Sequence, residues 1–345
     1  MWLKSIGNFY ATYWPSTGKQ IGRIRKRNVN GGHAVMTESV GKKQAERAEK
    51  IHGENAWMGT VFVLTAGVCW GFIGFFSSHL SGAGYSPVQL AFLRNIVASV
   101  AMWGYLLIFR RETLKINWKD LWMFIGTGTF SVVFFNIAYF MTIEQTTLSV
   151  AAILLYTAPC FVMVMSALLF HEKVTRTKGA ALVLALFGCA CTTGIFHGVG
   201  GSVPAFGIFT GIASGFCYAL YSIFGHIALK KYGTVTVTAY TFLVAAVSLL
   251  PFINMGEIAA LTAELPVLGN IIGIGIISTL LPYIFYTMGL QSTEPGKASV
   301  MAFVEPMVAT LVSIFILKEE FTWMGMAGVA AIFLSIVLLN VKGRD

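Results

Sequence analysis

Two ionisable side chains lie inside long apolar stretches of this sequence, where charge is rare. Arg94 sits in PVQLAFLRNIVAS and Glu305 in MAFVEPMVATL. A charged side chain on a helix in lipid costs roughly 2.5–3.5 kcal/mol on insertion scales, so such groups are functional candidates. An apolar environment favours the uncharged form of a carboxyl group, which would let Glu305 bind and release a proton near neutral pH. The alternatives are structural pairing or snorkelling for Arg94, and a hydrogen bond to a neighbouring helix for Glu305.

Prolines and polar-tipped aromatic residues accompany these charges. Pro306 follows Glu305, and Pro159 occupies the corresponding place in an earlier apolar stretch. A proline removes a helical hydrogen bond and frees a carbonyl, and paired broken helices are typical of midplane binding sites. Further candidates sit at depths where lipid-facing tyrosines are unusual: Trp70, Asn136, Tyr139, Tyr156, Tyr218, Tyr221, Tyr283 and Tyr286. A cavity lined by them would suit a small amphipathic or aromatic solute, although packing between helices explains any single one equally well.

The elements that must position these residues are repeated. Sliding residues 147–173 by 147 positions onto residues 294–320 aligns Ala151 with Ala298, Tyr156 with Phe303, Pro159 with Pro306 and Glu172 with Glu319. Near the start of each half, an offset of 148 aligns Gly67, Cys69 and Trp70 with Gly215, Cys217 and Tyr218. Each half is therefore one structural unit. The counterpart of Glu305 is Ala158, so the charge is not repeated, and the two glutamates at the span ends are expected to pair with loop Lys or Arg.

The composition is that of a protein with many membrane spans. Hydrophobic residues make up 56% of the 345-residue chain, charged residues 11%, and the mean hydropathy is +0.72. Apolar runs long enough to cross roughly 30 Å of hydrocarbon recur between short polar breaks. The sequence predicts ten spans, at residues 57–80, 87–109, 119–141, 148–170, 176–196, 204–229, 235–254, 266–290, 296–317 and 322–341. We expect an all-α integral membrane fold of two five-helix repeats, 57–196 and 204–341.

Five spans per half is an odd number, so the second half must enter the membrane from the opposite side, which predicts an inverted repeat. If the N-terminus is inside, 22 of the 24 Lys and Arg fall on the inner side, Lys318 falls on the outer side and Arg94 lies within a span. By the positive-inside rule we expect cytoplasmic termini and a multi-pass location in the inner or plasma membrane. Basic residues gathered in loops and tail, without interleaved aromatics, argue against a nucleic-acid partner.

Residues 1–56 form a polar, basic tail without an apolar run long enough for a signal peptide. Residues 41–54 could form an interfacial helix, and Met36 is a candidate translation start that would make residues 1–35 a mis-assigned extension. The five cysteines all fall in apolar runs and are expected to pack as small hydrophobes. We expect no cofactor and no metal, and without a P-loop sequence we do not expect ATP to be the energy source.

These stretches together resemble the drug/metabolite transporter superfamily, EamA type. The resemblance covers residues 57–341 and rests on TAGVCWGF (65–72), PVQLAFLRN (87–95), ILLYTAPCFVMVMSALLFHEK (153–173) and MAFVEPMVATLVSIFILKEE (301–320). The family's proline-containing helices correspond to Pro159 and Pro306, and its second-helix arginine to Arg94. The first-helix carboxylate of the small multidrug branch has no counterpart in residues 57–80.

The resemblance implies a secondary transporter of the inner membrane with a central cavity between the repeats, often an exporter of amino acids or related metabolites. We expect alternating access, a small-molecule substrate and a coupling proton. Because sugar and nucleotide-sugar carriers also belong to the superfamily, a carrier of nucleotides, sugars or drug-like compounds is the alternative, and a channel or scaffold is a further one. An enzyme is not expected, because the sequence contains no DxxD pair and no HExxH motif.

Overall fold

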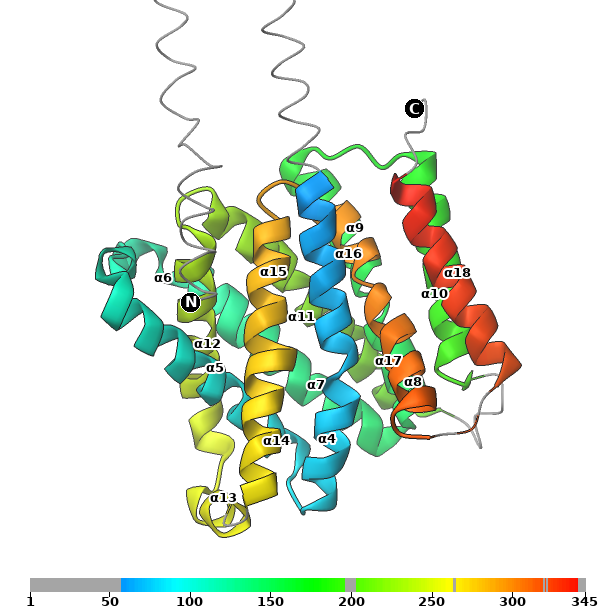
Figure 1. Ribbon diagram of the computed structural model, residues 1–345. Helices are drawn as coiled ribbons and strands as arrows, with labels where there is room; N and C mark the ends of the chain where they lie inside the picture. Colours follow the sequence, from blue (N-terminus) through cyan, green and yellow to red (C-terminus); the bar gives the residue numbers. More distant parts are fainter. Residues whose placement is uncertain (1–56, 196–202, 263–264, 319, 321, 341–345) are drawn as a thin grey trace, which may run out of the picture. The chain divides into compact units, whose positions relative to one another are not determined.

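The computed structural model describes residues 57–195, 203–262, 265–318, 320 and 322–340, and within these ranges the chain is helical and contains no strand. The basic tail, its candidate helix at 41–54 and Glu319 lie outside the described residues. The helices can be followed along the chain by their colour in Figure 1.

The helical segments of the first half are residues 57–71, α4 (Ile73–Gly82), α5 (Pro87–Phe109), α6 (Leu121–Ile125), η4 (Gly126–Val133), α7 (Phe134–Gln145), α8 (Leu148–Leu155), α9 (Ala158–Phe170) and α10 (Arg176–Thr192). Those of the second half are α11 (Ala205–Leu229), α12 (Thr234–Leu249), α13 (Met255–Leu261), α14 (Leu265–Gly275), η7 (Ile276–Leu280), α15 (Leu281–Gly289), α16 (Pro295–Met301), α17 (Val304–Phe315) and α18 (Trp323–Asn340). Short 3-10 turns occur at η2 (Arg111–Leu114), η3 (Trp118–Asp120) and η6 (Leu250–Phe252).

Nine of the ten expected spans are, among the described residues, helices long and apolar enough to cross a membrane. The fifth, α10, has 17 residues and is about 25 Å long at 1.5 Å per residue. It ends at Thr192 rather than at residue 196, because Gly194 takes a left-handed backbone conformation (φ 71°) that stops a helix. The expected all-α membrane fold is confirmed, with a fifth helix slightly shorter than predicted.

The repeat is visible in the way the helices end. The fourth and ninth spans finish in a left-handed residue at equivalent positions, His171 (φ 59°) and Lys318 (φ 61°). Four residues later, Thr175 and Thr322 accept a hydrogen bond from the backbone N–H three positions on, so each caps the first turn of the following helix. The two halves therefore share local stop and start signals as well as apolar runs.

Contacts at the helix ends show how the two halves are oriented. Thr60, at the start of the first span, donates to Asn340, the last residue of α18 (3.3 Å). Thr210, in the first turns of α11, instead accepts from Thr142 near the end of α7 (2.9 Å). The end of α7 is three crossings away from Thr60, so the first helix of the second half starts at the opposite end of the bundle. The two halves run through the helix bundle in opposite directions.

Extensive helix packing joins α10 and α18, which lie side by side in Figure 1. Gly188 and Gly328 allow this close approach, because a Cβ added at either would lie 2.6–2.8 Å from the carbonyl oxygen of the other. Small residues at a membrane helix interface let backbones approach closely.

Two π-helical segments occupy equivalent places in the third and eighth spans. They are η4 (Gly126–Val133) and η7 (Ile276–Leu280), and the repeat offset of 147 carries the second half of η4 onto η7. A π-segment inserts extra backbone per turn and is frequent at functional sites. In η7 the wider turn lets the Thr279 hydroxyl donate to the carbonyl of Ile274, five residues back (2.8 Å).

Polar groups join the two halves at the end of the bundle where the first span starts. Lys178 of α10 forms an ion pair with Glu294, which precedes α16, and the Glu172 carboxylate accepts from the Gly296 N–H (3.3 Å). Glu172 thus holds a backbone amide of the other half, whereas the sequence predicted a Lys or Arg partner. Burial raises the pKa of the Glu172 carboxyl, the nearby Glu294 charge adds to the shift, and the Gly296 N–H and Lys178 oppose it.

A raised carboxyl pKa makes folding stability depend on pH in a defined direction. The native state holds the Glu172 proton more tightly than the unfolded chain does, so this contribution is complete below the unfolded pKa and is lost as pH rises through the folded pKa. We expect Glu172→Gln to raise the melting temperature in detergent at pH 8 relative to the native protein, and to have less effect at pH 4. Glu144→Gln, at an exposed position on α7, is the control. An equal effect of Glu172→Gln at both pH values would contradict this assignment.

Candidate functional site

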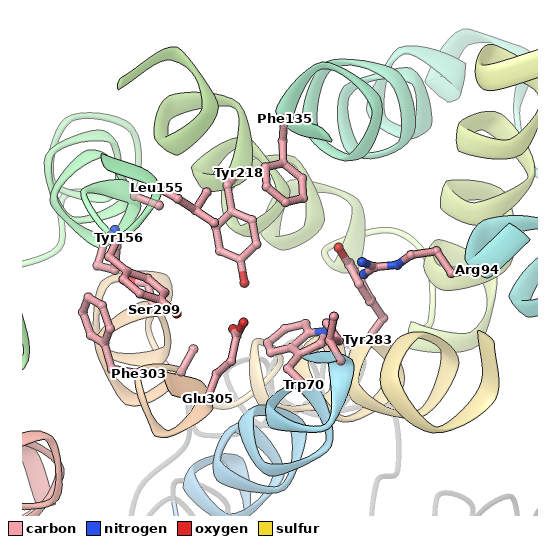
Figure 2. Close-up of a pocket in the computed structure, with 14 residues that line it drawn as sticks. Trp70, Arg94, Phe135, Leu155, Tyr156, Tyr218, Tyr283, Ser299, Phe303 and Glu305 are labelled. Atoms are coloured by element: carbon pink, nitrogen blue, oxygen red, sulfur yellow. The ribbon is translucent and has the colours of Figure 1, made fainter. Parts of the chain in front are cut away.

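A pocket near the middle of the bundle is lined by both halves. It encloses about 570 Å³ of space without atoms, part of it open to the exterior. Its lining residues are Trp70, Ile73, Arg94, Phe135, Leu155, Tyr156, Ala158, Pro159, Tyr218, Tyr283, Ser299, Ala302, Phe303 and Glu305. Figure 2 shows their side chains converging from several helices on one space. Small-molecule sites are likewise mostly apolar with a few placed polar groups.

Two helix breaks form neighbouring parts of the pocket wall. The fourth span is interrupted at residues 156–157, between α8 and α9, and the ninth at residues 302–303, between α16 and α17. Each break lies two to four residues before a proline, Pro159 or Pro306. A proline ring clashes with the carbonyl four residues before it, which is Leu155 in one half and Ala302 in the other. The prolines therefore bend the chain where it borders the pocket.

Two equivalent glycines bring the other half's first helix against each break. A Cβ at Gly215 of α11 would lie 3.0 Å and 3.1 Å from the carbonyl oxygens of Leu154 and Leu155. A Cβ at Gly67 would lie 2.1 Å from Val304 Cγ1 and 3.3 Å from the carbonyl oxygen of Ala302. Each half thus packs its first helix on the broken helix of the other, and the next turn carries the pocket residues Trp70 and Tyr218.

Glu305 is the single carboxylate in the pocket wall. It lies near the middle of the span Pro295–Phe315 and is partly accessible, because its carboxyl group reaches the pocket. Its oxygens form no hydrogen bond or ion pair with another described residue, so the hydrogen bond to a neighbouring helix considered from the sequence is not made. In Figure 2 the Tyr218 hydroxyl points across the pocket toward the Glu305 carboxyl group.

Arg94 supplies the opposite charge on another side of the same pocket. Its Nε donates to the Thr279 hydroxyl of η7 (3.1 Å), so the π-segment of the second half holds a side chain of the first. The guanidinium lies on the Tyr283 side of the pocket, and Trp70 is drawn between it and Glu305 (Figure 2). Arg94 and Glu305 form no ion pair with each other, and both side chains line the pocket. Both charges remain able to meet a ligand.

Comparison with known proteins identifies the family. The EamA-like transporter family matches residues 57–194 and again residues 205–341. The chain belongs to this family. It is therefore a multi-pass membrane transporter, and the resemblance described from its motifs is confirmed.

Relatives of this EamA-like chain carry general transporter names. An "Uncharacterized transporter" of Archaeoglobus fulgidus is 28% identical over 263 residues, 74% of this chain and 90% of the relative. The "Uncharacterized inner membrane transporter YicL" of Salmonella typhimurium is 25% identical over 296 residues, 83% of this chain and 96% of the relative. A solved crystal structure with a TM-score of 0.70 and 18% identity covers 83% of this chain and 97% of its own, and it shows the same fold.

Within this EamA-like fold the predicted site residues separate into two groups. Seven line the pocket: Trp70, Arg94, Tyr156, Pro159, Tyr218, Tyr283 and Glu305. Behind them, the Tyr221 hydroxyl bonds to Thr287 (2.7 Å) and the Tyr286 hydroxyl to Ser222 (2.8 Å). These two tyrosines support the wall, since their rings contact Tyr283 (4.8 Å between centroids) and Trp70 (5.4 Å) respectively.

The remaining three predicted residues also lie outside the pocket lining. Asn136 is buried and its amide donates to the carbonyl of Val132 in its own span. Tyr139 packs against Phe135 (6.0 Å between centroids), and Pro306 is buried next to Glu305. They shape the helices around the pocket and do not line it.

Seven lining residues were not among those predicted: Ile73, Phe135, Leu155, Ala158, Ser299, Ala302 and Phe303. The repeat could have found several of them. The offset of 147 pairs Leu155 with Ala302, Tyr156 with Phe303 and Ala158 with Glu305, and all six line the pocket. Of the rest, Phe135 carries no polar atom, and nothing in its sequence context separates it from lipid-facing phenylalanines.

The part of the chain that the structure describes contains no cluster of metal ligands and no disulfide. No group of three or more His, Cys, Asp and Glu side chains there could hold a metal ion. The five cysteines are free and lie within the helices. The polar chemistry of the described pocket is that of one carboxylate, one guanidinium, a serine, an indole and three tyrosine hydroxyls.

Proposed function

We propose that this transporter is a secondary carrier that exports amino acids or related small metabolites by alternating access. In this proposal it lies in the inner or plasma membrane, with both termini in the cytoplasm. The observation that carries the proposal is the pocket itself, in which a carboxylate and a guanidinium that do not pair with each other share aromatic walls. A zwitterion presents the complementary pair of charges, and the rings can hold its apolar part.

The opposite orientation of the two halves supports alternating access. A site formed at the interface of two inverted repeats can open to either side when one repeat rocks against the other. Each half contributes a broken helix to the pocket and packs its first helix on the other half's break, so rocking would move both walls together. Glu305 is the coupling group in this proposal, because a carboxylate without a protein partner can exchange a proton for a substrate charge.

Uptake into proteoliposomes tests the proposal. We expect saturable uptake of a labelled amino acid from a panel, accelerated when the lumen is made acidic, because an exporter exchanges substrate for protons moving the other way. Glu305→Gln should abolish the acceleration by the gradient, whereas Glu144→Gln should leave it unchanged. Gradient-independent uptake by the native protein would remove the proton from the mechanism. Uptake of sugars or nucleotides instead of amino acids would overturn the substrate class, and conduction without exchange would indicate a channel.

A further inference from the structure

The pocket has the composition of a cage for a positively charged group. Six of its lining side chains are aromatic: Trp70, Phe135, Tyr156, Tyr218, Tyr283 and Phe303. The electron-rich face of such rings attracts ammonium groups, with energies of about 0.5–1 kcal/mol at exposed sites and about 2 kcal/mol when desolvated. Aromatic cages with a nearby carboxylate therefore recognise organic cations.

The rings are held in place by one another. Trp70 and Tyr283 meet edge to face with centroids 5.4 Å apart, and Phe135 and Tyr218 do the same at 5.3 Å. Tyr156 and Phe303, its counterpart in the other half, meet with ring centroids 5.7 Å apart. Edge-to-face pairs of this kind fix ring orientation. The cage is preformed, so a ligand does not have to order it.

Glu305 lacks the partner that a carboxylate in a membrane interior requires. An ionised carboxylate only accepts hydrogen bonds, and Glu305 receives none from a described residue although Arg94 lines the same pocket. An ammonium group supplies three donors and a matching charge in one small group. Because the equivalent position in the first half is Ala158, this anchor exists on one side only, which fixes how a ligand is oriented.

Arg94 limits the charge that the ligand can carry. Its guanidinium is anchored by Thr279 on another side of the pocket, so it would repel a second cationic group placed near it. A ligand with one ammonium group and an apolar body satisfies Glu305 and the rings without meeting this repulsion. A carboxylate on the Arg94 side is tolerated, whereas a lone anion gains nothing from Glu305.

We infer that the ligand of this pocket is an organic monoammonium compound, anchored by its ammonium group on Glu305 with its apolar part among the aromatic rings. The inference rests on the proposed function, because it specifies the substrate class of the same pocket. It adds that the ammonium group is required, whereas the carboxylate of an amino acid is not.

Calorimetric binding to the purified full-length protein in detergent tests this without transport. The probes are phenethylamine, 3-phenylpropionate with a similar skeleton and a negative charge, and p-xylylenediamine with two positive charges. We expect phenethylamine to bind at least tenfold more tightly than either of the others. Glu305→Gln should weaken phenethylamine binding at least tenfold, Glu305→Asp should weaken it less, and Glu144→Gln should leave it unchanged. Unaltered melting temperatures would show that the variants are folded.

The possible outcomes are distinct. Equal binding of phenethylamine and 3-phenylpropionate, unchanged binding by folded Glu305→Gln, or no binding of phenethylamine at millimolar concentration would each overturn the inference. Equal binding of the diamine would overturn the limit to one ammonium group. Amine binding without uptake of any substrate would contradict the proposed transport function while supporting this inference. Uptake of an amino acid without binding of phenethylamine would support the proposed transport function and contradict this inference.

Discussion

Gly215→Leu is expected to abolish substrate uptake and to destabilise the folded protein. The position has no room for a side chain. A Cβ there would lie 2.6 Å from Thr157 Oγ1, and 3.0 Å and 3.1 Å from the carbonyl oxygens of Leu154 and Leu155 at the helix break. Backbone cannot rotate away as a side chain can, so α11 must separate from the fourth span. Overpacking costs about 1–3 kcal/mol. The displacement would also carry Tyr218 and Tyr156 away from the pocket.

The repeat supplies a second variant and a matched control. Gly67→Leu should have the same effect, because its Cβ would meet Val304 beside the other break. Gly74 lies on the same span, seven residues further on, and a Cβ there meets nothing within 4 Å. Gly74→Leu should therefore keep native uptake and a native or higher melting temperature, since leucine favours a helix more than glycine does. Both readouts, proteoliposome uptake and melting in detergent, apply to all three variants. If Gly215→Leu and Gly67→Leu behaved like Gly74→Leu, the packing of each first helix on the opposite break would not be required.

Much of the fold could be predicted because its signals are local and repeated. Apolar length predicts a span, Gly and Pro mark its ends, and a sequence match at an offset of 147 extends what is learned in one half to the other. The fourth span illustrates this, since residues 148–170 were predicted and the helix runs from Leu148 to Phe170 with a break before Pro159. The two π-segments were not predicted, because the extra backbone of a π-turn has no distinctive residue pattern.

Whether an individual side chain points toward lipid or toward the protein interior could be predicted less well, for a physical reason. A membrane helix is apolar toward lipid and apolar toward its neighbours, so hydrophobic periodicity does not show which side faces the protein. Charged residues are less ambiguous, and Arg94 and Glu305, which were predicted as site residues, both line the pocket. Tyrosines are less ambiguous only in part. Tyr218 and Tyr221 lie three residues apart on α11, yet one lines the pocket and the other bonds to Thr287 behind it.

Arg94→Gln is expected to separate two classes of ligand that the native pocket accepts. The Arg94 guanidinium is available to a ligand carboxylate, and a hydrogen bond to a charged group contributes about 1.5–3 kcal/mol. At about 1.4 kcal/mol per factor of ten, binding of L-phenylalanine should weaken by roughly 10- to 150-fold. Binding of phenethylamine, which lacks the carboxylate, should stay the same or become tighter, because a positive charge has left the pocket.

The comparison of these two ligands separates a binding role of Arg94 from a structural one. If Arg94 only held η7 in place through Thr279, its loss would disturb the pocket wall and weaken both ligands alike. Thr279→Val removes the acceptor of the Arg94 Nε hydrogen bond while keeping the charge, so it should weaken L-phenylalanine less than Arg94→Gln does. Equal weakening of L-phenylalanine and phenethylamine by Arg94→Gln would assign the arginine to the scaffold. A selective loss of L-phenylalanine would place the two charges of the pocket at the two ends of a bound zwitterion, with Glu305 on the ammonium and Arg94 on the carboxylate.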